Sequence, residues 1–141
     1  MKKLILLATL LTVFMAAGCA NRNQHILDSN GAEQLKLRSM QTRIYDTSDR
    51  ESTLRTVIAT LQDLGFVIDK ADSRLGSVSA TKLEKYDLRM TVSVRPKSAE
   101  QLSVRANAQY NIYPVTDPEP YQRFFDALSK SLFLTAQMEE E

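Results

Sequence analysis

Apolar side chains occupy every second position in two long segments, residues 88–95 and 102–112. A period of two is typical of a strand with one dry and one wet face. The turn-forming residues Pro96-Lys97-Ser98 join the two segments, so the pattern predicts an antiparallel hairpin. We expect Val94 to lie opposite Leu102 in this hairpin.

Residues 54–64 carry a helical period, with apolar side chains at spacings of three and four. Ser48 and Glu51 match a capping box ahead of this segment, and Gly65 closes it as a left-handed cap. The polar side of the predicted helix carries Arg55, Thr56, Gln62 and Asp63. The apolar side therefore needs a partner surface.

The end of the chain predicts a second helix. Asp117 is its expected N-cap, and Pro118 takes the first helical position. Its apolar stripe consists of Tyr121, Phe124, Phe125, Leu128, Leu132 and Ala136. Residues 139–141 are all glutamate, and we interpret them as a solvated acidic tail.

Shorter segments complete the predicted fold. Residues 36–45, 66–69 and 76–83 favour strands, and the turn residues 72–76 join the last two. The order is strand, helix, four antiparallel strands and a final helix. An antiparallel sheet of about five strands with two helices on one face buries both helical stripes, which is a two-layer α+β arrangement. Our specific expectation is a helix-grip fold, in which the sheet curls around the final helix.

The first 18 residues differ in character from the rest. A basic start is followed by an apolar run and then by the small residues Ala16, Ala17 and Gly18. These are the three parts of a bacterial export signal. The 14 residues from Leu4 to Ala17 would reach about 21 Å as a helix, which is short of the roughly 30 Å of hydrocarbon in a bilayer. We therefore expect residues 1–18 to be a signal peptide rather than a membrane span.

The segment Ala16-Ala17-Gly18-Cys19 resembles the lipobox of bacterial lipoproteins, with Ala16 where that pattern usually has Leu. The resemblance implies that Cys19 carries acyl chains such as palmitate and becomes the mature N-terminus. In that family an Asp after the cysteine favours the inner membrane. Ala20 therefore implies the outer membrane, facing the periplasm. Cys19 is the only cysteine and has no disulfide partner in the chain; the alternative is an ordinary buried thiol.

The 123 residues after the leader fit one domain of ordinary size. Residues 20–34 are polar, contain Gly31 and show no sustained period. We interpret residues 19–34 as the lipidated N-terminus with a flexible tether, and residues 35–138 as a single periplasmic domain.

Charge and composition argue against several functions. The chain has 18 Lys and Arg against 17 Asp and Glu, so no strong net field supports nucleic-acid binding. His25 is the only histidine and lies in the tether, which argues against a histidine-based nucleophile pair or metal site in the domain. No glycine-rich phosphate loop is present, and no motif spacing links the carboxylates Asp63, Asp69, Asp72, Glu84 and Asp87. We therefore expect a protein without enzymatic activity, cofactor or metal.

Two surface features are candidates for partner binding. Arg89, Arg95 and Arg105 share the wet face of the hairpin, where the predicted register sets Arg105 opposite Thr91, and Arg43 is a fourth candidate. This face could bind an anionic lipid headgroup, glycan carboxylate or acidic protein surface, or it is a solvated face whose arginine stems cover apolar surface. The second feature is an aromatic group, either a docking patch or a packed corner between strand and helix, formed by Tyr110, Tyr113 and Tyr121.

Residues 54–81, in particular Leu61–Ile68 and Gly76–Val78, resemble the helix–strand–hairpin unit of helix-grip lipoprotein domains. The BamC component of the β-barrel assembly machinery contains two such domains, whereas this chain has room for one. The same stretch is similar to small lipoproteins that accompany tripartite efflux systems. The resemblance carries over no catalytic or ligand-binding residue.

These patterns favour one function over two alternatives. We expect a non-enzymatic, lipid-anchored outer-membrane protein whose periplasmic domain binds or supports another envelope component. The first alternative is a domain that binds a small apolar or amphipathic ligand between helix and sheet, in a cavity lined by Tyr121, Phe124 and Phe125. The second is an envelope enzyme, which would need a polar cleft with close carboxylates.

Overall fold

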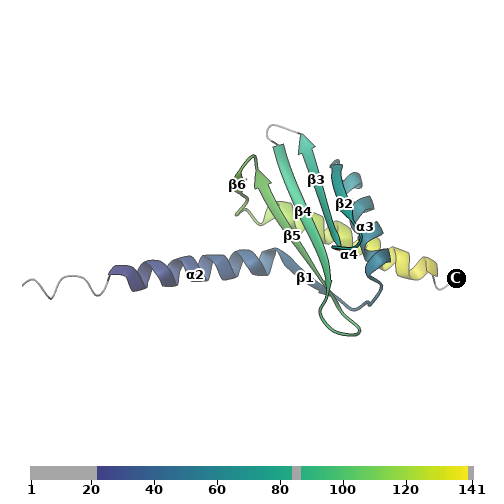
Figure 1. The fold of residues 1–141 in the computed structure, drawn as a ribbon, viewed down its shortest axis with the longest axis horizontal. Helices are drawn as coiled ribbons and strands as arrows, with labels where there is room; N and C mark the ends of the chain where they lie inside the picture. The colour runs from purple at the N-terminus through teal and green to yellow at the C-terminus, as the bar shows by residue number, and fades with distance from the viewer. Residues whose placement is uncertain (1–21, 84–86, 140–141) are drawn as a thin grey trace, which may run out of the picture. The chain divides into compact units, whose positions relative to one another are not determined.

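The structure is a computed structural model and describes residues 22–83 and 87–139, which divide into two units between Lys36 and Leu37 (Figure 1). The expected signal peptide, the lipobox residues Ala16, Ala17 and Gly18, and the lipidation site Cys19 lie outside the described residues. The end of the expected acidic tail, residues 140–141, also lies outside them. The sheet and the two helices packed on it belong to the unit that begins at Leu37.

Six strands form one antiparallel sheet in the order β1-β5-β4-β3-β2, and the short β6 pairs with β5 beside β1 (Figure 1). The strands are β1 (Thr42–Tyr45), β2 (Val67–Asp72), β3 (Ser77–Leu83), β4 (Asp87–Pro96), β5 (Leu102–Tyr110) and β6 (Tyr113–Pro114). The predicted antiparallel sheet of about five strands is thereby confirmed, with β6 as a two-residue addition.

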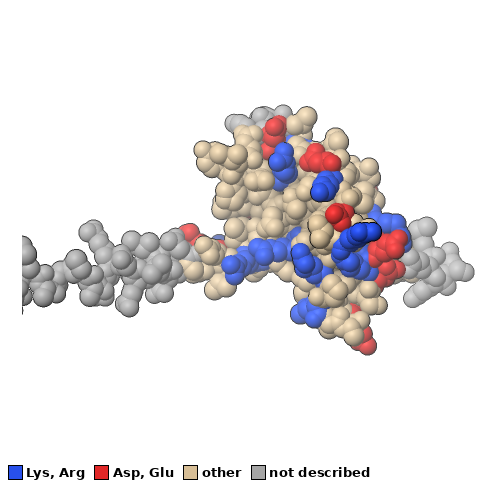
Figure 2. Space-filling model, viewed as in Figure 1, with Lys and Arg blue, Asp and Glu red and all other residues tan. Residues whose placement is uncertain are grey.

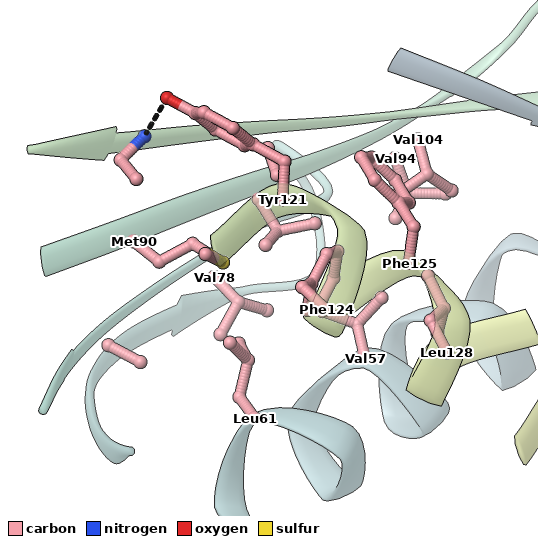
Figure 3. Packing of buried hydrophobic residues seen from close by; sticks show 14 of the residues in the cluster. Val57, Leu61, Val78, Met90, Val94, Val104, Tyr121, Phe124, Phe125 and Leu128 are labelled. Carbon is pink, nitrogen blue, oxygen red and sulfur yellow. Dashed lines mark hydrogen bonds between the residues drawn. The ribbon is translucent and has the colours of Figure 1, made fainter. Parts of the chain in front are cut away.

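Two helices, α3 (Arg50–Asp63) and α4 (Glu119–Glu139), form the second layer behind the sheet (Figure 1). The alternation of the strands explains this layering, because Val92, Val94 and Val104 point to the helices and are fully buried. The helices fill the core with Leu61 from α3 and Phe124 from α4, among others (Figure 3). The predicted two-layer α+β architecture is confirmed.

A third helix, α2 (Arg22–Met40), runs where the sequence led us to expect an irregular tether and the start of a strand. The tether segment is therefore helical from Arg22 onward, and the strand predicted over residues 36–45 begins only at Thr42. The sequence of α2 is mostly polar and its few apolar residues do not recur with a helical period, so it lacks the apolar stripe by which a helix is usually detected.

The start of α3 differs in detail from the predicted capping box. Asp49, not Ser48, is the N-cap, and its side chain accepts a hydrogen bond from the backbone nitrogen of Ser52 at 2.9 Å. The apolar stripe is buried as predicted, but Thr56, expected on the wet side, is buried as well. Its hydroxyl donates to the carbonyl of Ser52 at 3.0 Å, which satisfies the polar group inside the fold.

The helix ends as predicted, at a left-handed glycine. Gly65 has φ +83°, and its N–H bonds the carbonyl of Gln62 at 2.9 Å. The N–H of Phe66 bonds the carbonyl of Leu61, also at 2.9 Å, which completes a Schellman motif. This ending turns the chain directly into β2.

The register of the long hairpin is two residues away from the prediction. Val94 pairs with Val104 rather than with Leu102, because residues 97–101 form a five-residue loop closed by the bond from Lys97 N–H to the Gln101 carbonyl. A shift of two residues preserves the face of every side chain. The predicted dry and wet faces are therefore present, while the predicted cross-strand neighbours are wrong.

Tyr121 of α4 closes a gap in the sheet edge between β1 and β6. Its buried hydroxyl donates to the carbonyl of Val115 at 2.8 Å and accepts from the backbone nitrogen of Ala108 at 3.3 Å (Figure 3, dashed line). The side-chain amide of Gln41 also lies 3.3 Å from this oxygen. A side-chain hydroxyl thus satisfies a β5 backbone group that no strand reaches.

Candidate functional site

The sheet face turned away from the helices, which we call the outward face, carries the three arginines singled out in the sequence. Arg89 and Arg95 come from β4 and Arg105 from β5, and all three are exposed. Figure 2 views the molecule from this side, with blue side chains standing over the strands. The remaining positions of β3, β4 and β5 on this face are mostly serine, threonine, asparagine and glutamine.

The observed register divides the three arginines. Arg105 lies opposite Ser93, and Arg95 lies opposite Ser103, so that Arg95 and Arg105 are diagonal neighbours. Diagonal residues of this kind are about 7–8 Å apart. Arg89 pairs with Gln109 and is six residues from Arg95 along β4, a separation of about 20 Å. We call the four positions 93, 95, 103 and 105 the Arg95–Arg105 patch.

Arg43 does not join this group, which corrects its prediction as a fourth candidate for the face. Arg43 pairs with Val104 and therefore points to the helix side of the sheet. Its guanidinium lies over the ring of Phe125, 5.1 Å from the ring centroid, and donates to the carbonyl of Ser39. Next to it, burial raises the pKa of Tyr45, whose hydroxyl lies 3.1 Å from Oγ of Ser129.

The second surface is the turn between β5 and β6. The sequence predicted an uninterrupted strand to Ile112, but β5 ends at Tyr110, and Tyr110 pairs with Tyr113 across a two-residue turn. Asn111 adopts φ +52° in this turn. Ile112 and Tyr113 are 79% and 70% exposed, so the turn presents apolar surface to solvent.

More exposed apolar side chains lie at the same end of the sheet. Leu83 ends β3 and is 73% exposed, and Val67, 69% exposed, pairs with Thr81 near that end. Val67 and Leu83 lie on the outward face, whereas Tyr110 and Tyr113 pair on the helix side. We therefore use the name sheet-end surface for Tyr110, Ile112 and Tyr113 only. An apolar group of this kind on a small domain is typical of an interaction site.

A hollow of about 250 Å³ adjoins the sheet-end surface, between the end of α3 and the start of α4. Its apolar lining comes from Leu64, Phe66, Leu88, Tyr110, Pro120 and Phe124, and its charged lining from Lys82, Asp117, Glu119 and Arg123. Lys82, Leu88 and Tyr110 are residues of the helix-facing side of the sheet at this end. The hollow thus forms where the strands extend past the helices that cover them elsewhere.

The three tyrosines named in the sequence take two different positions. Tyr121 is the packed corner residue described above, whereas Tyr110 and Tyr113 are exposed at 39% and 70%. Tyr121, Phe124 and Phe125 fill the core between α4 and the sheet, each at most 2% exposed. Of these three only Phe124 lines the hollow, so the aromatic cavity considered between helix and sheet is occupied by the side chains themselves.

Reactive groups are dispersed over the described part of the chain. No group of three or more His, Cys, Asp and Glu side chains is arranged to hold a metal ion among residues 22–83 and 87–139. His25 lies in α2, and Glu84 falls outside the described residues. None of the described helices combines the length and the apolar character needed to cross a bilayer. Neither a protein-family model nor a curated protein matches the sequence.

Sequence patterns alone did not reveal the sheet-end surface. Ile112 continues the period of two of β5, so it resembled a core residue of that strand. The one signal of a turn was Asn111, because asparagine tolerates a positive φ better than most residues. Leu83 and Val67 likewise fit a strand pattern, but both lie on the outward face, which the helices do not cover.

Proposed function

We propose that this protein is a lipid-anchored lipoprotein of the outer membrane whose periplasmic domain binds another envelope protein through the sheet-end surface, without catalysing a reaction. The observation that carries the binding part is the exposed turn with Ile112 and Tyr113 beside a hollow lined by both apolar and charged side chains. The anchoring part is supported by the leader pattern and by Cys19 at the lipobox position.

The size of the hollow favours a protein partner over a free small ligand. Ligand pockets usually measure about 300–1,000 Å³ and enclose most of the ligand. The hollow measures about 250 Å³ and lies among exposed apolar side chains that a small molecule would leave uncovered. One large apolar side chain from a partner would occupy the hollow while the surrounding chain covers Ile112 and Tyr113.

The charges around the hollow describe the partner further. The lining contains two basic residues, Lys82 and Arg123, and two acidic ones, Asp117 and Glu119. Nη1 of Arg123 lies 3.9 Å from Oε1 of Glu119. Two charges of each sign give no preference for a strongly charged ligand. The expected partner segment therefore presents an apolar anchor between polar side chains of both signs.

Metabolic labelling with palmitate tests the anchor. We expect the wild-type protein to take up label in cells and Cys19→Ala to remain unlabelled, because the thiol is the only site for a thioether-linked lipid. Fractionation should recover the labelled protein with the outer membrane, and Ala20→Asp should redirect it to the inner membrane. An unlabelled wild type would contradict the anchoring proposal.

Photocrosslinking in intact cells tests the binding surface. With benzoylphenylalanine replacing Tyr113, we expect one adduct with an envelope protein. A second substitution, Ile112→Ser, should reduce its yield about tenfold, since a central apolar contact contributes more than 1 kcal/mol to binding. Ile112→Ser should change the free energy of unfolding by no more than about 0.5 kcal/mol, because the side chain is 79% exposed.

The matched control moves the crosslinker to Leu75 in the turn between β2 and β3, which is 62% exposed and lies at the other end of the sheet. The same adduct from Leu75, or an adduct from Tyr113 that Ile112→Ser leaves unchanged, would show that contact is not specific to the sheet-end surface. Absence of any adduct at Tyr113 would argue against a protein partner.

A further inference from the structure

The Arg95–Arg105 patch brings two cations together among uncharged neighbours, and Asp72 of β2 lies on the same face beyond Ser77. Arg105 lies between Ser93 and Thr42 across the sheet, and Arg95 lies beside Ser103, which in turn pairs with Ile44. Ser77 flanks Ser93 on β3. Apart from the two guanidinium groups, every one of these neighbouring positions is uncharged.

In the part of the chain that the structure describes, neither Arg95 nor Arg105 forms an ion pair with a carboxylate. Arg105 donates instead to Oε1 of Gln41 at 3.3 Å, a neutral acceptor that holds the group on the side away from Arg95. The side chains that lie between the two arginines, Ser93 and Ser103, are short.

We propose that the Arg95–Arg105 patch binds the phosphate group of an anionic phospholipid, so that only the end of the outward face that carries the patch lies against the membrane. Guanidinium groups match phosphate oxygens in a bidentate geometry, and the two arginines, diagonal neighbours about 7–8 Å apart, are within reach of one headgroup once Arg105 leaves Gln41. The hydroxyls of Ser93 and Ser103 are further donors beneath it. Ile44, 39% exposed, adds an aliphatic contact at the edge of the patch.

Binding of a headgroup by two arginines is weak, and it becomes effective through the lipid anchor of the proposed function. Two arginines near an anionic membrane contribute only a weak affinity in solution. A lipid anchor holds the domain at an effective concentration in the millimolar range, at which weak sites are occupied. The inference thus deepens the proposed function by adding the membrane surface as a second contact, remote from the sheet-end surface.

Vesicle co-sedimentation tests the inference, using the mature chain with Cys19→Ser so that no acyl chain contributes. We expect binding to phosphatidylcholine vesicles that contain phosphatidylglycerol and none to phosphatidylcholine alone. Arg95→Gln and Arg105→Gln should each weaken binding about fivefold, and the double variant about thirtyfold. Arg89→Gln is the matched control, with the same charge change on the same face.

Arg89→Gln should weaken vesicle binding less than twofold at physiological salt. Arg89 lies about 20 Å from Arg95, and the Debye length is only about 8 Å. Equal losses in all three single variants would show diffuse attraction and overturn the site. Equal binding to the two types of vesicle would also overturn the inference. So would a result in which inorganic phosphate shifts the amide resonances of Ser93 and Ser103 but the protein binds no vesicles. Each of these results leaves the crosslinking from Tyr113 unaffected, so failure of this inference is separable from failure of the proposed function.

Discussion

Replacing Gly76 by alanine is expected to lower the free energy of unfolding by about 3 kcal/mol. Gly76 adopts φ +64°, a left-handed conformation that costs an L-residue with a side chain about 1–2 kcal/mol. An added Cβ would also lie 2.6 Å from the carbonyl oxygen of Val94 and overlap the guanidinium of Arg50. Overpacking of this kind typically adds about 1–3 kcal/mol.

Neither neighbour of Gly76 can withdraw without loss. The N–H of Val94 bonds the carbonyl of Gly76 at 2.8 Å, so a shift of β4 breaks a backbone hydrogen bond. The guanidinium of Arg50 joins the start of α3 to the sheet through the carbonyls of Val94, at 3.3 Å, and Arg74, at 2.9 Å. Substitution at Gly76 therefore also loosens the contact between the two layers.

Gly65→Ala is the matched control, measured by urea unfolding alongside Gly76→Ala. Gly65 has φ +83°, but the nearest atom to an added Cβ is Cε of Lys82 at 3.5 Å, an ordinary contact. We expect Gly65→Ala to cost about 1 kcal/mol from the backbone conformation alone. Equal losses for the two variants would contradict the steric argument at Gly76.

The sequence patterns identified the parts of the fold in which burial repeats with a fixed period. The alternation in β4 and β5 and the stripes of α3 and α4 face one common core, so local spacing predicted which side chains are buried. No such repeat exists in α2, which is why residues 22–40 were expected to contain a tether and the start of a strand. The cap at Asp49 was missed because Ser48 and Asp49 are both good N-cap residues in sequence.

The candidate sites depended on information that is not local. In the predicted register Arg105 lay diagonal to Arg89, whereas in the observed register it lies diagonal to Arg95. The five-residue loop at residues 97–101 decides between these pairings, and loop length is not encoded in strand alternation. The sheet-end surface likewise depends on where α3 stops and α4 starts relative to the strands. The sequence therefore identified the arginine face but not the arrangement of its charges.

Replacing Tyr121 by phenylalanine is the second change expected to have a large effect, a loss of about 3 kcal/mol in the free energy of unfolding. The ring is fully buried, so Tyr121→Phe preserves the packing and removes only the hydroxyl. That hydroxyl bonds the carbonyl of Val115 at 2.8 Å and the backbone nitrogen of Ala108 at 3.3 Å. A buried group left without a partner costs about 1–3 kcal/mol, and two backbone groups lose this partner together.

Hydrogen exchange distinguishes this mechanism from a general loss of stability. The Ala108 amide bonds the Tyr121 hydroxyl rather than a neighbouring strand, so in Tyr121→Phe its protection should fall further than that of Val94 and other amides inside the sheet. Tyr113→Phe, at a 70% exposed position, should change stability by no more than about 0.5 kcal/mol. The opposite result would be an Ala108 amide that keeps its protection relative to the other sheet amides in Tyr121→Phe. The hydroxyl would then not be what closes the gap between β1 and β6, and the backbone there would have to satisfy its hydrogen bonds without α4.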